Sequence, residues 1–86
     1  MPGIIRKNDK NVRNQPALVG AENFKIEDKN AIVKNDPVGN ETSYVKTTSS
    51  SRNFIVNGKP VTLIGDADTN NVTRRTGSNT FIVGKS

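Results

Sequence analysis

The chain has 86 residues, which is enough for one small domain and excludes a large enzyme fold. Hydrophobic residues make up only 31% of it, while Asn, Ser and Thr supply 26 positions, a composition that suits turns and β edges and disfavours helices. The chain contains neither Cys nor His, so it lacks disulfides, the usual zinc ligands and His-based nucleophile pairs. The composition therefore predicts an all-β protein that is not an enzyme and holds no cofactor.

The net charge is +5, from 13 Lys and Arg against 8 Asp and Glu. Such a charge fits nucleic acid, an anionic surface or simple solubility. The basic residues are spread along the chain, with the densest pairs at Arg6-Lys7 and Arg74-Arg75, and few aromatic residues could stack on bases. Solvated surface charge is therefore favoured, and a small basic nucleic-acid-binding β domain is kept as the alternative. Apolar runs reach only three residues, so neither a signal peptide nor a membrane span is expected.

Strands are predicted in four segments: residues 2–9, 23–36, 53–66 and 80–86. Residues 23–36 can be laid on residues 53–66 without gaps, at an offset of 30 residues. The C-terminal segment repeats the first half of this unit, and residues 2–9 repeat the second half with one extra residue. Joining the two chain ends thus completes a third unit. The sequence predicts one domain, residues 1–86, shaped as a small cone of three pseudo-threefold β-hairpin repeats.

Each unit is predicted to be a β-hairpin. Asn57-Gly58 predicts a type I′ turn, because both residues tolerate positive φ, whereas Glu27-Asp28 at the same place is a poorer turn. Alternation assigns one uniformly apolar face to the core. Its members are Phe24, Ile26, Ala31, Val33, Phe54, Val56, Val61, Leu63, Phe81, Val83 and Ile5.

The opposite face of the hairpins is about half apolar, which is unusual for a face in contact with solvent. Its isoleucines recur in each unit, as contact with a threefold partner would require. The predicted partner-binding residues are Ile4, Ile32, Ile55, Ile64 and Ile82. The alternative is that these isoleucines lie under the connecting segments as ordinary core. Those segments, residues 10–22, 37–52 and 67–79, are long, and are predicted to pack into a second layer rather than stay floppy.

Several charged residues are candidate sites. Asp9, Asp36 and Asp66 share one repeat position, so they either form a threefold carboxylate site for Mg²⁺ or Ca²⁺ or close turns by accepting backbone N–H bonds; the turn is favoured. Asp66 and Asp68 form a weak candidate for an acid/base pair, because no cleft is evident around them. Arg74-Arg75 could contact phosphate, but such a pair in a loop is usually solvated.

One known family carries a similar pattern. The pattern comprises Asn53-Phe54-Ile55-Val56-Asn57-Gly58-Lys59-Pro60-Val61, Gly65-Asp66, the opening Met1-Pro2-Gly3-Ile4-Ile5, and Asp9. It resembles the PAAR-repeat proteins, which cap the trimeric β-helical spikes of contractile phage tails and type VI secretion machines. The spike-tip proteins of T4-like phages are the most similar group, since no effector extension is expected at either end.

The resemblance implies a function and a location. It implies a monomeric cone on the blunt C-terminal end of a homotrimeric spike, one copy per trimer, located on the virion baseplate. The apex would touch the target membrane transiently, and nucleic acid is not an expected partner. The chain departs from the family where Pro60-Val61-Thr62-Leu63 replaces the Pro-Ala-Ala-Arg segment. Many family members hold zinc near the apex with His and Cys, so no zinc is expected here.

Overall fold

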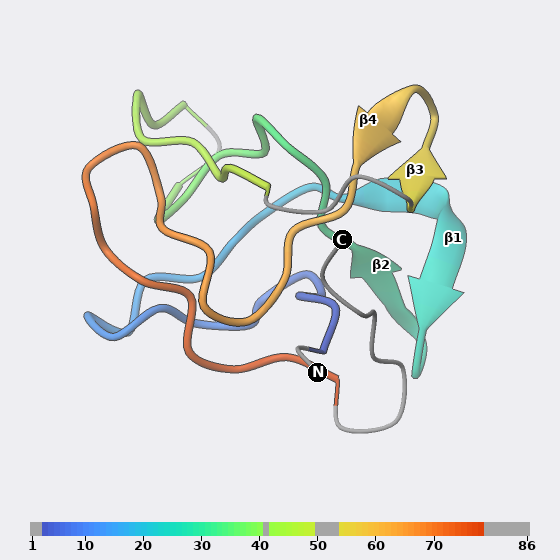
Figure 1. The fold of residues 1–86 in the computed structure, drawn as a ribbon, viewed down its shortest axis with the longest axis horizontal. Coiled ribbons are helices and arrows are strands. Elements are labelled where there is room, and N and C mark those ends of the chain that lie inside the picture. The colour runs from blue at the N-terminus through green and yellow to red at the C-terminus, as the bar shows by residue number, and fades with distance from the viewer. Residues whose placement is uncertain (1–2, 41, 50–53, 79–86) are drawn as a thin grey trace.

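Short strands and turns carry the fold. The computed structural model describes residues 3–40, 42–49 and 54–78 (Figure 1). Within them, β1 (Ala21–Ile26) pairs with β2 (Lys29–Ala31), and β3 (Ile55–Val56) pairs with β4 (Lys59–Pro60), both antiparallel. These residues form no helix, so no helix among them could cross a membrane. The prediction of an all-β protein is confirmed.

Both hairpins turn through two residues with positive φ. Asn57 and Gly58 have φ angles of 55° and 80°, which confirms the predicted type I′ turn. Glu27 and Asp28 have φ angles of 54° and 66°, so the less suitable residues adopt the same turn. In the β1–β2 ladder the register shifts between the pairs Lys25–Asn30 and Ala21–Ala31. The β3–β4 ladder is regular.

Three segments far apart in the sequence hydrogen-bond to one another in a closed cycle. They are residues 3–7, 30–34 and 60–64. The amide of Ile5 donates to the carbonyl of Thr62, that of Thr62 to Ile32, and that of Ile32 back to Ile5, each at 2.9 Å. A second cycle joins the same three segments. In it the amide of Lys7 donates to the carbonyl of Asn30, that of Lys34 to Pro60, and that of Ile64 to Gly3. We call these three segments, joined by these contacts, the inner cycle.

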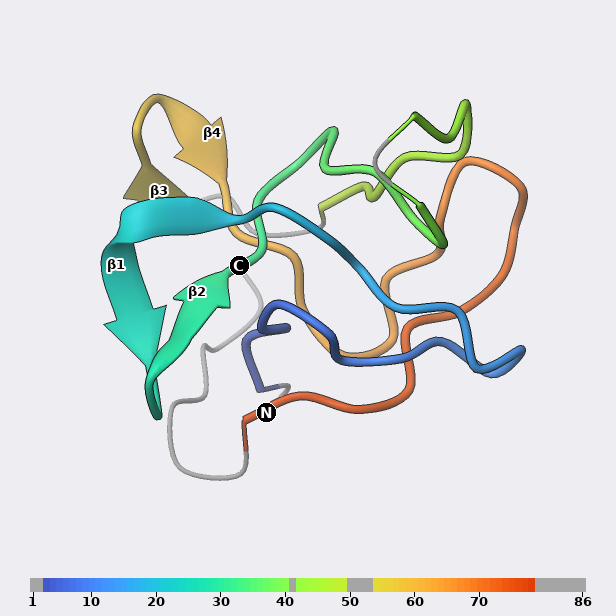
Figure 2. The same ribbon diagram turned by 180° about the vertical axis from the view of Figure 1, so that it is seen from behind.

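The connecting segments pack against one another at the end of the molecule away from the two hairpins (Figures 1 and 2). They are bonded in a cyclic order as well. Three amides donate to carbonyls of a neighbouring segment: Val12 to Thr73, Gly39 to Pro16 and Thr69 to Lys46, at 3.0, 2.8 and 2.9 Å. We call the described parts of these segments, residues 10–19, 37–40, 42–49 and 67–76, the loop layer. The prediction that they pack into a second layer is confirmed.

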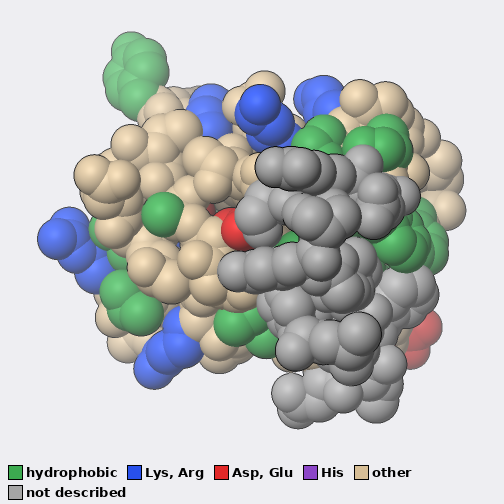
Figure 3. Space-filling model, viewed as in Figure 1, with side chains coloured by type: hydrophobic (Ala, Val, Ile, Leu, Met, Phe, Trp, Pro, Cys, Tyr) green, Lys and Arg blue, Asp and Glu red, His purple; other side chains and the backbone are tan. Residues whose placement is uncertain are grey.

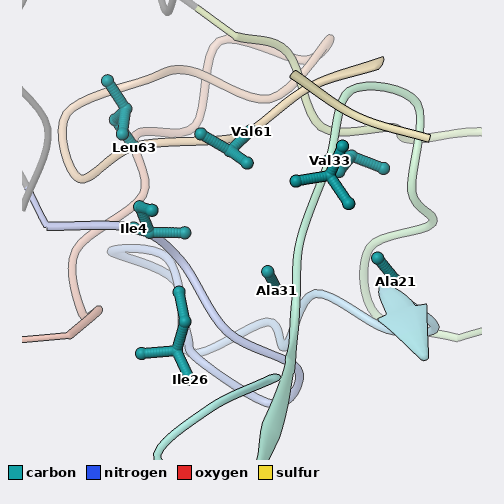
Figure 4. Close-up of a cluster of buried hydrophobic side chains, with 8 residues drawn as sticks. Ile4, Ala21, Ile26, Ala31, Val33, Val61 and Leu63 are labelled. Atoms are coloured by element: carbon teal, nitrogen blue, oxygen red, sulfur yellow. The ribbon is translucent and has the colours of Figure 1, made fainter. Parts of the chain in front are cut away.

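The main core lies between the hairpins and the inner cycle. Its buried side chains are Ile4, Ala21, Ile26, Ala31, Val33, Val56, Val61 and Leu63. Figure 4 shows Ile4, Ala31, Val61 and Leu63, which come from the three segments of the inner cycle. A smaller cluster of Ile5, Ala17 and Ile32, with Ile64 packed against it, lies where the inner cycle meets the loop layer. Burial of these two clusters joins the layers into one body.

The predicted faces of the N-terminal segment are wrong. Ile4 lies in the main core, where it bridges to Leu63, and Ile5 lies in the smaller cluster. The reason is register. The spacing from Ile4 to Asp9 equals the spacing from Ala31 to Asp36. Residues 2–9 therefore match the other units without the extra residue that the sequence alignment assumed. Both faces of the segment are buried, which explains why both isoleucines are fully excluded from solvent.

Candidate interaction surfaces

The same aspartate turn follows each segment of the inner cycle. The carboxylates of Asp9, Asp36 and Asp66 accept the amide of the residue three positions earlier, at 2.8, 2.9 and 2.9 Å. The residue before each aspartate has positive φ: Asn8 at 73°, Asn35 at 74° and Gly65 at 95°. The turn-closing role is therefore confirmed. Within the described residues, no group of three or more carboxylates could hold a metal ion.

Burial raises the pKa of Asp36 above the ordinary aspartate value. The amide of Val33 and the nearby Lys59 and Lys46 favour the charged form, but desolvation is the largest effect. The backbone amide of Asp36 donates to the hydroxyl of Thr47 at 3.0 Å. Asp36 is thus a largely buried carboxylate in a hydrogen-bonded turn.

The predicted partner-binding isoleucines divide into two groups. Ile4 and Ile32 are fully buried, so neither can present its side chain to a partner. Ile55 is 51% exposed, and Ile64 is half-buried against the smaller cluster. Ile82 lies outside the described residues. Of the described set, only Ile55 and Ile64 reach the surface.

The two hairpins are joined side by side at the end where Ile55 lies. The rings of Phe24 and Phe54 stack with centroids 5.5 Å apart and planes 17° apart. The side-chain amides of Asn23 and Asn57 bond to each other reciprocally, at 2.9 and 3.0 Å. Both phenylalanines are only partly buried. The hairpin end therefore offers partly exposed aromatic and aliphatic surface on a framework fixed by paired contacts.

A buried ion pair lies inside the loop layer, where sequence analysis expected only solvated charge. Arg74 Nη2 lies 2.9 Å from Asp68 Oδ2, and neither side chain is exposed. Arg74 also donates to the carbonyls of Asp9 and Gln15, at 3.1 and 2.9 Å, and Asn11 Nδ2 donates to Asp68 Oδ2 at 3.0 Å. Burial lowers the pKa of Arg74, and Asp68 opposes this effect.

The expectation of a solvated Arg74-Arg75 pair is therefore half wrong. Arg75 is exposed and bonds the side-chain carbonyl of Asn14 at 2.7 Å. Arg74 faces the opposite way, because adjacent residues of an extended chain point to opposite sides. The weak acid/base candidate was Asp66 with Asp68. The side chain of Asp68 is enclosed and paired with Arg74.

A further polar contact is centred on Arg6. Arg6 bonds the carboxylate of Asp9 at 2.9 Å and that of Glu27 at 2.9 Å. The hydroxyl of Ser78 donates to Glu27 at 2.8 Å. The hydrogen bond with Asp9 is the largest effect that raises the pKa of Arg6, so Arg6 stays positively charged. The β1–β2 turn is thereby tied to the inner cycle.

No known family model matches this chain, and no curated protein is significantly similar to it.

Proposed function

We propose that the chain is a structural tip that caps and sharpens a homotrimeric β-helical spike of a contractile phage tail or a related injection machine. It would act as a monomer, one copy per trimer, and help the spike to pierce a membrane. The observation that carries this proposal is the cyclic bonding of three separate segments in the inner cycle. Equivalent backbone groups recur there three times within one chain.

A symmetry argument connects that pattern to a trimeric partner. One asymmetric chain can match a threefold surface only if its own contacts recur with every third of a turn. The hairpins β1–β2 and β3–β4 supply two such contacts. We assign the third to residues 80–86, completed by residues 2–9, which gives a pseudo-threefold cone. Residues 80–86 lie outside the described residues, so this part of the proposal comes from the repeat in the sequence.

The hairpin end is the proposed base. Ile55 is the most exposed of the predicted contact residues, and the stacked Phe24 and Phe54 are partly exposed beside it. Ile4 lies in the main core behind this surface, whereas Ile32 lies in the smaller cluster next to the loop layer, so neither would touch the partner. A standard interface buries about 800 Å² per partner, which the end of a chain of this size can supply. The loop layer would then form the apex.

Co-purification with candidate trimeric spike proteins tests the proposal. Ile55→Asp should abolish capping, because a carboxylate buried at the interface without a partner is strongly unfavourable. The variant should still fold, since Ile55 is 51% exposed in the free chain. Tyr44→Asp is the matched control: Tyr44 is 99% exposed and lies in the loop layer, so capping should persist. Equal capping by both variants, with circular dichroism unchanged, would reject the hairpin end as the base.

A further inference from the structure

The described residues distribute charge unevenly between the loop layer and the hairpin end. The loop layer carries cations that form no ion pair among the described residues: Lys10, Arg13, Lys46 and Arg75. Its one described carboxylate, Asp68, is buried against Arg74 and is neutralised there. The sequence adds Glu41, which lies outside the described residues. The loop layer therefore presents unbalanced positive charge.

The hairpin end carries charges of both signs. Among the described residues, its exposed charged residues are Glu22, Lys25, Glu27, Asp28, Lys29 and Lys59, which sum to zero. The sequence adds Arg52 and Lys85, which lie outside the described residues. In Figure 3, Lys and Arg side chains appear at the left, at the lower left and along the top of the molecule, and acidic side chains appear near the centre and near the right edge. Among the described residues, positive charge therefore predominates in the loop layer, although the basic residues are spread along the sequence.

The aspartates of the three turns add little negative charge to the surface near the loop layer. Asp9, Asp36 and Asp66 lie at the border of the loop layer, yet they are only 6%, 8% and 7% exposed. Each carboxylate accepts a backbone amide within its own turn, and Asp9 is also paired with Arg6. Little negative charge therefore reaches solvent beside the exposed cations.

Exposed apolar side chains accompany these cations. Tyr44 is 99% exposed and Val12 is 57% exposed, and both belong to the loop layer. A tyrosine and aliphatic groups beside Lys and Arg are the combination that binds the interface of an anionic membrane, where the ring enters the headgroup region and the cations meet phosphate. We propose that the loop layer binds the surface of anionic phospholipid membranes.

A membrane is favoured over nucleic acid by the shortage of stacking groups. Single-stranded nucleic acid is commonly held by bases stacked on several aromatic side chains in a basic groove. Tyr44 is the only aromatic residue that the loop layer contains. The inference extends the proposed function, because the loop layer is the proposed apex, but it concerns the chain alone. Vesicle binding and spike capping can therefore fail independently.

Co-sedimentation with vesicles tests this inference. The free chain is mixed with vesicles of phosphatidylcholine, with or without one-third phosphatidylglycerol, at low and at physiological salt. Two triple variants remove the same charge from opposite ends of the molecule. The loop-layer variant is Lys10→Gln, Arg13→Gln and Arg75→Gln, and the hairpin-end variant is Lys25→Gln, Lys29→Gln and Lys59→Gln. All six side chains are exposed, so both variants should fold, which circular dichroism checks.

The wild-type chain should bind the anionic vesicles, bind pure phosphatidylcholine poorly, and bind less as salt rises. Each cation near an anionic surface adds about fivefold to binding, so the loop-layer variant should lose about a hundredfold. The hairpin-end variant should lose far less. Equal losses in the two variants, or no preference for phosphatidylglycerol, would overturn the proposal. It would also be overturned if an oligonucleotide bound more tightly than the vesicles and displaced the chain from them.

Discussion

The guanidinium of Arg74 lies 2.9 Å from the carboxylate of Asp68, and neither side chain is exposed to solvent. Because Arg74 also bonds the carbonyls of Asp9 and Gln15, it links one connecting segment to another. Asp68 Oδ1 and Arg74 Nε have no hydrogen-bond partner among the described residues. The interior of the loop layer is therefore held by one ion pair and its backbone contacts, and the loss of either partner leaves the other charge buried.

Removal of either charge should destabilise the protein strongly. Arg74→Leu and Asp68→Val should each lower the free energy of unfolding by about 3–5 kcal/mol, because an unpaired charge remains in a dry site. The double variant should be less destabilised than the sum of the two, since no charge then remains. Urea unfolding of all three variants measures this coupling.

Arg75→Leu is the control for that series. Arg75 is exposed, so its replacement should change the free energy of unfolding by less than about 0.5 kcal/mol. An Arg74→Leu variant as stable as Arg75→Leu would contradict the buried ion pair.

The raised pKa of Asp36 predicts a pH dependence. A folded-state pKa above that of the unfolded chain stabilises the fold at low pH, below the unfolded pKa, and this stabilisation is lost as pH rises through the folded pKa. Asp36→Asn can still accept the Val33 amide but cannot ionise. Relative to wild type, the variant should therefore gain stability between acidic and neutral pH. Urea unfolding across that range tests the sign, and a relative loss of stability with rising pH would contradict it.

The β1–β2 turn should improve with glycine. Asp28 has φ 66°, which costs a non-glycine residue about 1 kcal/mol, so Asp28→Gly should stabilise the protein by up to that amount. Gly58→Ala is the mirror test. Gly58 has φ 80° and no atom within 4 Å of an added Cβ, so any loss of stability comes from backbone strain alone. Thermal unfolding of both variants should shift in opposite directions, and shifts of the same sign would refute the strained turn.

Chelation should leave the protein unchanged. Each turn aspartate is used within its own turn, and the chain has neither His nor Cys. EDTA should therefore not move the melting temperature, and elemental analysis should find no tightly held zinc or iron. A fall of more than about ten degrees would instead reveal a structural ion held by oxygen ligands.

Local signals in the sequence predicted local structure well. Asn57-Gly58 specified its turn because few other residue pairs tolerate two positive φ angles, and Asp9, Asp36 and Asp66 closed turns within three residues of their partners. Such contacts depend on adjacent residues alone. The repeat also pointed to the equivalent segments that bond in the inner cycle.

Signals that depend on tertiary contact were missed. Ile4 and Ile5 are both apolar and both buried, so alternation could not tell which of them faces the main core. The Arg74–Asp68 pair was missed because nothing in the sequence says that a loop arginine turns inward. The sequence did hold one clue, because Arg74 lies six residues after Asp68. A carboxylate that becomes buried in a packed layer needs such a cation as its partner.

The central claim is that this single chain matches a threefold partner. Native mass spectrometry of the chain mixed with a candidate spike tests it most directly, because it counts the copies in the complex. The account predicts one copy per spike trimer at any excess of the chain, since a pseudo-threefold surface occupies all three equivalent sites at once. Three copies per trimer would mean that each chain binds one spike subunit, and would contradict the account.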